Sequence, residues 1–153
     1  MTEAPELADG PAFGFSDDEL ATCPTPFRDG LFAGRRVLVT GGGSGLGKAI
    51  ATLFARLGAE VALAGRKRER LEATATFLRG FGGRVVVQPM TIRDPADVAA
   101  CFDALGMAMG GIDILVNNAG GQFPQPAIDF SVKGWNAVID TNLNGTWYMM
   151  QAA

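Results

Sequence analysis

The sequence predicts an α/β fold in which helices cover both faces of a doubly wound parallel sheet. Short apolar runs, typical of buried parallel strands, alternate with segments of helical period. A glycine-rich turn joins the first such strand to the first helix. The resulting order, β-α-β-α-β-α-β-α, indicates parallel strands joined by right-handed crossovers. The four predicted strands are centred on residues 37–39, 61–64, 85–87 and 114–116.

The sequence predicts a helix after each of these strands, because apolar residues in the segment that follows recur every three or four positions. Their apolar positions are Leu46, Ile50, Leu53, Phe54 and Leu57 in the first, Leu71, Ala75 and Leu78 in the second, Val98, Phe102, Leu105 and Met109 in the third, and Trp135, Val138, Ile139 and Leu143 in the fourth. Gly58 is suited to end the first helix. Asp94, followed by Pro95, is suited to begin the third, and Ser131 to begin a fourth that runs to the end of the chain.

The 153 residues allow one domain and little more. Residues 1–33 hold seven acids, one base and four prolines. We interpret them as an extended acidic arm with one short helical turn near residues 17–21, either loose or wrapped over the domain. Residues 34–153 are then the domain itself.

Composition excludes several classes of protein. A hydrophobic content of 48% is enough for a core, and a net charge of −3 argues against a dedicated nucleic-acid binder. With no histidine, Ser-His-Asp and Cys-His catalytic devices and histidine-containing zinc sites are excluded. Two cysteines cannot form a metal cluster or a disulfide framework, and unpaired thiols fit a reducing compartment.

No targeting signal or membrane-spanning run is visible, so we expect a cytoplasmic protein that binds no membrane.

The glycine turn, Thr40 to Gly47, is the strongest functional signal. Amide groups at a helix N-terminus have no internal partner and attract anions, provided that no side chain blocks the approach. Gly41 permits the tight turn, Gly45 a close approach of phosphate, and Gly47 close packing of helix and strand. A flexible loop without a ligand is the alternative, but the strand-turn-helix context favours a dinucleotide. The turn lacks the Gly-Lys-Ser/Thr of a Walker loop, which disfavours ATP or GTP.

The end of the second strand indicates which dinucleotide is bound. An NAD site usually places a carboxylate there, whereas this chain has Arg66, Lys67 and Arg68. Arg66 is suited to a bidentate contact with a 2′-phosphate, worth about 1.5–3 kcal/mol. The alternative is a solvated basic start to the second helix. We therefore predict NADP(H) rather than NAD(H).

Three motifs together resemble those of the short-chain dehydrogenase/reductase family. They are Thr40-Gly41-x-x-x-Gly45-x-Gly47, Asn117-Asn118-Ala119-Gly120 and Asn142-Leu143-Asn144-Gly145. Their order and separations also match, and the resemblance covers residues 34–153. It implies a Rossmann-type sheet. The segment 117–124 looks like that of enoyl-CoA and 2,4-dienoyl-CoA reductases or citronellol dehydrogenases.

The resemblance also implies roles for individual residues. The diphosphate is expected beside Gly41, Ser44 and Leu46, the 2′-phosphate at Arg66, the adenosine ribose beside Asn118, Ala119 and Gly120, and the proton relay at Asn142. Thr91 stands where the family often has an acid near adenine, which leaves that contact open. Structural alternatives exist for the amides: Asn117 and Asn118 could bond strand-end backbone, and Asn142 backbone within its own helix.

The family's Tyr-x-x-x-Lys pair is missing. Tyr148 is the only tyrosine, and Ala152 stands four residues later. We therefore expect a cofactor-binding part without the catalytic C-terminal part, its sheet truncated after about four strands and its fourth strand left with an unpaired edge.

Three functional hypotheses remain. The first is an NADP(H)-dependent oxidoreductase acting on a small-molecule substrate, either a carbonyl/alcohol or an enoyl-CoA-like acyl-CoA, of which this chain alone is inactive. The second is a non-catalytic dinucleotide-binding module or subunit. The third is assembly, for example a homo-oligomer, through the tryptophan- and methionine-containing residues 131–153.

Overall fold

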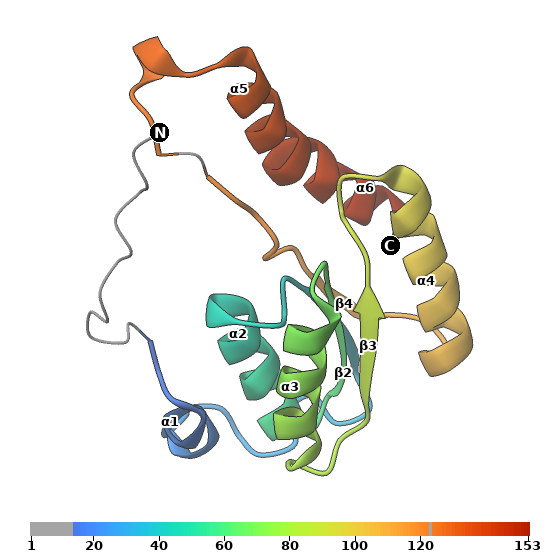
Figure 1. Ribbon diagram of the computed structural model, residues 1–153. Coiled ribbons are helices and arrows are strands. Elements are labelled where there is room, and N and C mark those ends of the chain that lie inside the picture. Colours follow the sequence, from blue (N-terminus) through green and yellow to red (C-terminus); the bar gives the residue numbers. More distant parts are fainter. Residues whose placement is uncertain (1–13, 123) are drawn as a thin grey trace.

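Four parallel strands form one sheet in the order β3-β2-β1-β4. The computed structural model describes residues 14–122 and 124–153 (Figure 1). The strand bounds are β1 Arg36–Thr40, β2 Glu60–Gly65, β3 Val85–Pro89 and β4 Ile114–Val116. This is the predicted Rossmann-type order, and the crevice between β1 and β4 is where the strand order reverses.

Helices cover both faces of the sheet, as predicted. Helices α2 (Gly45–Arg56) and α3 (Arg68–Arg79) pack on one face, where Val37 and Val39 point. Helices α4 (Pro95–Met109) and α6 (Gly145–Ala152) pack on the other, where Leu38 points. Strand residues alternate between the faces, so each strand contributes to both cores. Burial raises the pKa of the Cys101 thiol to about 11, which keeps this α4 side chain uncharged in its core.

The predicted helix caps are confirmed. Asp94 Oδ1 accepts a hydrogen bond from the Ala96 amide at 2.9 Å, with Pro95 following it. Ser131 Oγ accepts one from the Gly134 amide at 3.0 Å. Gly58 has φ +90°, which favours glycine just after the end of α2.

The last helix differs from the single regular helix that the sequence predicts. Helix α5 (Val132–Ile139) continues through a π-helical turn, η2 (Asp140–Asn144), into α6 (Figure 1). In that turn the Gly145 amide donates to the Asp140 carbonyl, five residues back. Periodicity alone cannot reveal such an insertion, because it shifts the pattern by only one residue. A short 3₁₀ turn, η1 (Ala127–Asp129), precedes α5.

The described part of the N-terminal arm lies along α2. It contains α1 (Asp17–Thr22), where the sequence predicts a short helical turn. Lys48 Nζ forms an ion pair with Asp17 at 2.5 Å. The Arg56 guanidinium donates to the carbonyls of Leu20 and Cys23 at 2.9 and 2.7 Å. The arm therefore contacts α2 through α1 and Cys23, while residues 1–13 of the predicted arm lie outside the described residues.

Strand β4 is an edge strand in the described part of the chain. It pairs with β1 through the Val37–Ile114, Leu38–Leu115 and Val39–Val116 registers. All three β4 residues are half-buried. The predicted unpaired edge is thus present among the described strands.

The start of β1 is tied to the start of β4 by an ion pair. The Arg36 guanidinium donates to both carboxylate oxygens of Asp113 at 2.8 and 2.9 Å, and the Arg36 amide donates to the same carboxylate at 2.8 Å. The guanidinium also donates to the Gly110 carbonyl at 2.5 Å. These hydrogen bonds hold the pKa of Asp113 well below its usual range.

We therefore expect Asp113→Asn to lower the stability of the full chain at neutral pH. Because the folded-state pKa of Asp113 is depressed, the carboxylate contributes all of its stabilisation above its unfolded pKa of about 3.9. That contribution is lost as the pH falls below this value. Urea midpoints of wild type and variant, measured from pH 7 downward, should converge in acid; a difference independent of pH would contradict the ion-pair account.

Candidate functional site

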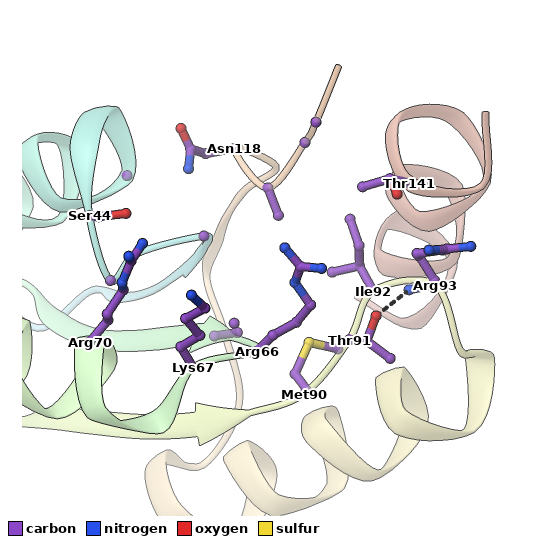
Figure 2. A pocket seen from close by; sticks show the side chains of 18 of the residues that line it. Ser44, Arg66, Lys67, Arg70, Met90, Thr91, Ile92, Arg93, Asn118 and Thr141 are labelled. Atoms are coloured by element: carbon purple, nitrogen blue, oxygen red, sulfur yellow. Dashed lines mark hydrogen bonds between the residues drawn. The ribbon is translucent and has the colours of Figure 1, made fainter. Parts of the chain in front are cut away.

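A cavity of about 600 Å³ lies at the carboxyl ends of the strands (Figure 2). Its walls are the glycine turn after β1, the start of α3 after β2, the loop after β3, the segment after β4, and one face of α5 and η2. Ligands of open α/β sheets bind in this crevice, beside the switch in strand order. The position of the cavity therefore follows from the topology.

Thr40, the last residue of β1, holds the two strands together where the cavity begins. Its hydroxyl donates to the Val116 carbonyl at 3.2 Å and accepts from the amides of Asn118 and Ala119 at 3.0 and 2.9 Å. The Asn118 side-chain amide donates to the Thr40 carbonyl at 2.9 Å. Thr40 is 1% exposed, so these bonds are shielded from water. They fix the spacing between the glycine turn and the segment after β4.

The glycine turn needs glycine for two different reasons. Gly41 and Gly45 have φ of +68° and +53°, which L side chains rarely adopt. Gly47 is buried in α2, and a Cβ there would overlap the Gly41 carbonyl and the Asn118 side-chain amide. The first turn of α2 can therefore lie directly against β1, as the sequence predicts.

The N-terminus of α2 faces the cavity without a side-chain cap. Ser44 is the N-cap residue, but its hydroxyl makes no capping hydrogen bond and is exposed. Gly41, Ser44, Leu46 and Gly47 all line the cavity. Free amides and a free hydroxyl at a helix N-terminus are suited to an anionic group.

The segment after β4 is held by η2. Asn142 Oδ1 accepts from the Gly121 amide at 3.0 Å, and its Nδ2 donates to the Gly121 carbonyl at 2.7 Å and the Val138 carbonyl at 3.0 Å. A Cβ on Gly120 would lie 2.6 Å from Asn142 Oδ1. A Cβ on Gly145 would lie 2.8 Å from Ile92 Cγ1, so this glycine allows the helix to approach the loop after β3. The Asn142–Gly145 motif thus joins two walls of the cavity.

The charge of the lining is positive. Arg66, Lys67, Arg70 and Arg93 line the cavity, and no Asp or Glu is among the described residues that do so. Arg93 forms a long ion pair with Asp140 at 3.7 Å. The other three cations have no ion-pair or hydrogen-bond partner within residues 14–122 and 124–153. The site therefore favours anionic ligands.

Nine of the twelve predicted site residues line the cavity: Gly41, Ser44, Leu46, Gly47, Arg66, Thr91, Asn118, Ala119 and Gly120. Three do not. Thr40 and Asn142 support the walls through the hydrogen bonds above, and Gly45 shapes the turn. The Thr91 hydroxyl accepts from the Arg93 amide at 3.3 Å within its own loop. Phe123, in the segment that carried part of the resemblance, lies outside the described residues.

Sequence reasoning missed two cationic residues of the lining, Arg70 and Arg93. Arg70 stands four residues after Arg66, a spacing that places both on one side of a helical start. Arg93 stands two residues after Thr91, on the predicted strand-end loop. Apolar periodicity gives no weight to such positions.

Two further classes of site are absent from the described residues. Within residues 14–122 and 124–153, no group of three or more Cys, Asp or Glu side chains is placed to hold a metal ion. None of the helices described is both long and apolar enough to span a bilayer.

Comparison with known proteins agrees with this geometry. The profile of the short chain dehydrogenase family matches residues 35–153. The chain belongs to this family. It is 46% identical over 122 residues to a probable 2,4-dienoyl-CoA reductase of Caenorhabditis elegans, covering 78% of this chain and 40% of that protein.

Solved structures of family members superpose on the fold. The citronellol catabolism dehydrogenase of Pseudomonas aeruginosa has a TM-score of 0.80 and 41% identity, covering 84% of this chain and 52% of that one. A Burkholderia cenocepacia short chain dehydrogenase in complex with NADP has a TM-score of 0.76 and 36% identity, covering 80% and 50%. This short-chain dehydrogenase chain thus spans between two fifths and about half of the length of the relatives it matches.

We expect Gly47→Ala to abolish dinucleotide binding or weaken it strongly, because the new methyl group would push α2 away from the Gly41 carbonyl and Asn118. Binding is measured by titration with NADPH, and folding by urea denaturation of the same samples.

Gly106→Ala is the matched control. Gly106 lies exposed inside α4, with no atom within 4 Å of an added Cβ. The substitution should leave binding unchanged and raise stability by about 0.5–1 kcal/mol, since alanine is the better helix former. Equal binding by both variants would contradict the close-approach argument.

Proposed function

We propose that this chain is the NADP(H)-binding part of a short-chain dehydrogenase/reductase that transfers a hydride to or from a small-molecule substrate. One observation carries the proposal. A glycine-rich turn, at the uncapped N-terminus of α2, opens into a cavity that is lined by four cationic residues and, within the described chain, by no acid. Fold and family make a nicotinamide dinucleotide the expected cofactor.

The residues present fit the diphosphate of such a cofactor. Gly41, Ser44 and Gly47 line the cavity at the start of α2, where the Ser44 side chain makes no capping hydrogen bond to the first amides of the helix. Helix N-termini bind phosphate through unpaired amides and the helix dipole. We assign Leu46 and Ser44 to the same contact.

The choice of NADP(H) over NAD(H) is supported by charge. A ribose 2′-hydroxyl is usually bound by an acid after β2, but Arg66 and Lys67 occupy these positions and line the cavity. The NADP complex of the Burkholderia relative is consistent with this choice. We assign Arg66 to the 2′-phosphate side of the ribose and Thr91 to the adenine side.

The remaining assignments concern the wall after β4. We assign Asn118, Ala119 and Gly120 to the adenosine ribose of the cofactor, because they form that wall. Asn142 holds that wall through Gly121. The bound cofactor would supply the hydride, and these residues would fix its position. In a complete enzyme of this family Asn142 would also support the proton relay.

The substrate is proposed from the relatives. The names of several similar proteins describe 2,4-dienoyl-CoA reductases, from Caenorhabditis elegans and from Bacillus subtilis. We therefore propose an enoyl-CoA-like acyl-CoA as one substrate class and a carbonyl or alcohol as the other. The cytoplasmic location inferred from the sequence stays a prediction.

An assembly role for residues 131–153 accompanies this proposal. Trp135, Leu143, Trp147 and Met150 are each more than half exposed, between 52% and 62%. Exposed apolar groups of this size are typical of protein interfaces. This supports a homo-oligomer formed through α5 and α6. The rival hypothesis of a purely non-catalytic binding module is not favoured, because the family is one of oxidoreductases.

We expect the purified chain to bind NADPH more tightly than NADH. The added 2′-phosphate would make charge-assisted hydrogen bonds worth about 1.5–3 kcal/mol, or roughly a 10- to 100-fold difference in Kd. Parallel fluorescence titrations with the two reduced cofactors at fixed ionic strength measure the ratio. A ratio near one would remove NADP(H) from the proposal.

We also expect this 153-residue chain to bind cofactor without turning it over. It contains no Tyr-x-x-x-Lys pair, and Tyr148 is followed by Ala152. Steady-state absorbance at the NADPH band is followed with an enoyl-CoA and with a carbonyl substrate. Sustained oxidation of NADPH by the pure chain would show that another residue supplies the proton.

A further inference from the structure

Arg70 is a cation of the cavity that the family resemblance did not assign. It stands in the first turn of α3 and lines the cavity, although it lies four residues beyond the strand-end arginine. Figure 2 shows its guanidinium directed toward Ser44, on the side of the glycine turn. Arg66, in contrast, is directed toward Ile92, across the cavity (Figure 2). The two arginines thus project from the same wall of the cavity, and their guanidinium groups are directed to different parts of it.

Close packing between α3 and the glycine turn fixes the position of Arg70. A Cβ on Gly43 would lie 3.1 Å from Arg70 Cβ and 3.2 Å from the Leu71 amide nitrogen. Any side chain at position 43 would therefore push the first turn of α3 outward. The neighbouring Leu71 is 2% exposed and anchors this turn in the core. The base of the Arg70 side chain is held beside the turn by packing on both sides.

Arg70 differs from the neighbouring arginines of α3 in its ion pairing. Arg68 and Arg79 both form ion pairs with Glu72, at 3.7 and 3.8 Å. Arg70 lies between them in sequence, yet it has no ion-pair partner in the described part of the chain, as is true of Arg66 and Lys67. Within the described residues, the cations that line the cavity on the α3 side are unpaired, while Arg68 and Arg79 of the same helix, outside the lining, are paired. Three unpaired like charges repel one another, and an anion bound among them relieves that repulsion.

We propose that Arg70 is a specificity-determining residue that binds the 2′-phosphate of NADP(H) from the side of the glycine turn, together with Lys67. This inference rests on the proposed function, since it concerns the same cofactor. Arg66, next to Met90 and Ile92, then contacts the same phosphate from the strand end. Guanidinium and ammonium groups are suited to the terminal oxygens of a phosphate monoester, which presents more free oxygens than a diphosphate. Discrimination against NAD(H) is therefore shared between the strand end and α3.

The test compares Arg70→Ala with Arg68→Ala in the full chain. Both residues are exposed and lie in the same helical turn, and both substitutions remove one positive charge. Each variant is titrated with NADPH and with NADH, and calorimetrically with adenosine 2′,5′-bisphosphate and 5′-AMP. We expect Arg70→Ala to weaken binding of NADPH and of the bisphosphate roughly tenfold or more. Binding of NADH and 5′-AMP should be unchanged, and Arg68→Ala should leave the affinity for all four ligands close to that of wild type.

The outcomes separate this inference from the proposed function. A wild-type preference for NADPH that is undiminished in Arg70→Ala overturns the role of Arg70 alone. Equal weakening of NADPH and NADH binding overturns it as well, because Arg70 would then contact the diphosphate. Equal losses of NADPH affinity in Arg70→Ala and Arg68→Ala would mean that only the general surface charge matters, and this result would also overturn the role of Arg70. A wild-type chain that binds NADPH and NADH equally overturns the proposed cofactor together with this inference. Urea midpoints equal to that of wild type establish that each variant is folded.

Discussion

The site depends on the buried hydroxyl of Thr40. Strands β1 and β4 must separate at their carboxyl ends, because the cavity opens between them. Where they separate, the regular ladder ends and amides lose their partners. The Thr40 hydroxyl accepts from two of these amides and donates to the Val116 carbonyl. A buried amide without an acceptor costs about 1–3 kcal/mol. One side chain therefore stabilises the divergence that the ligand site requires.

Close approaches extend from this point to the other walls. Gly47 lets α2 lie on the Gly41 carbonyl and the Asn118 side chain, which in turn donates to the Thr40 carbonyl. On the far side, Asn142 clamps both backbone groups of Gly121. Gly145 then brings the same helix onto Ile92. The three motifs, residues 40–47, 117–120 and 142–145, are distant in sequence. Their contacts form one network, in which each wall of the cavity is held in position by the wall next to it. Displacing one wall would consequently disturb the others.

The order of strands and helices along the chain, the helix pattern and nine residues of the cavity lining were predictable, because each rests on local patterns that agree with the topology. The caps at Asp94 and Ser131 and the positive φ at Gly58 show this directly. The π-helical turn was not predicted, since no local pattern marks it; Asn142 within it and Gly145 directly after it lie against segments that are distant in sequence. Thr40 and Asn142 were predicted as cofactor-binding and catalytic residues, yet their side chains bond to protein backbone. Motif matching identifies such residues, but it does not distinguish a residue that contacts the ligand from one that holds the wall of the cavity in position.

The arrangement of charge extends this reasoning to selectivity. A cation that lies in solvent gains little from a single exposed ion pair, so pairing of Arg68 with Glu72 contributes little to stability. The absence of such pairing for Arg66, Lys67 and Arg70, within the described residues, has a larger consequence. Positive side chains around a concave, partly apolar wall raise the electrostatic potential in the cavity. Each negatively charged group of a bound ligand is stabilised by that potential. A dinucleotide with an additional phosphate therefore gains more than one without it, even when each contact is weak. Because the cations remain exposed, salt screens this gain, and the preference is greatest at low ionic strength.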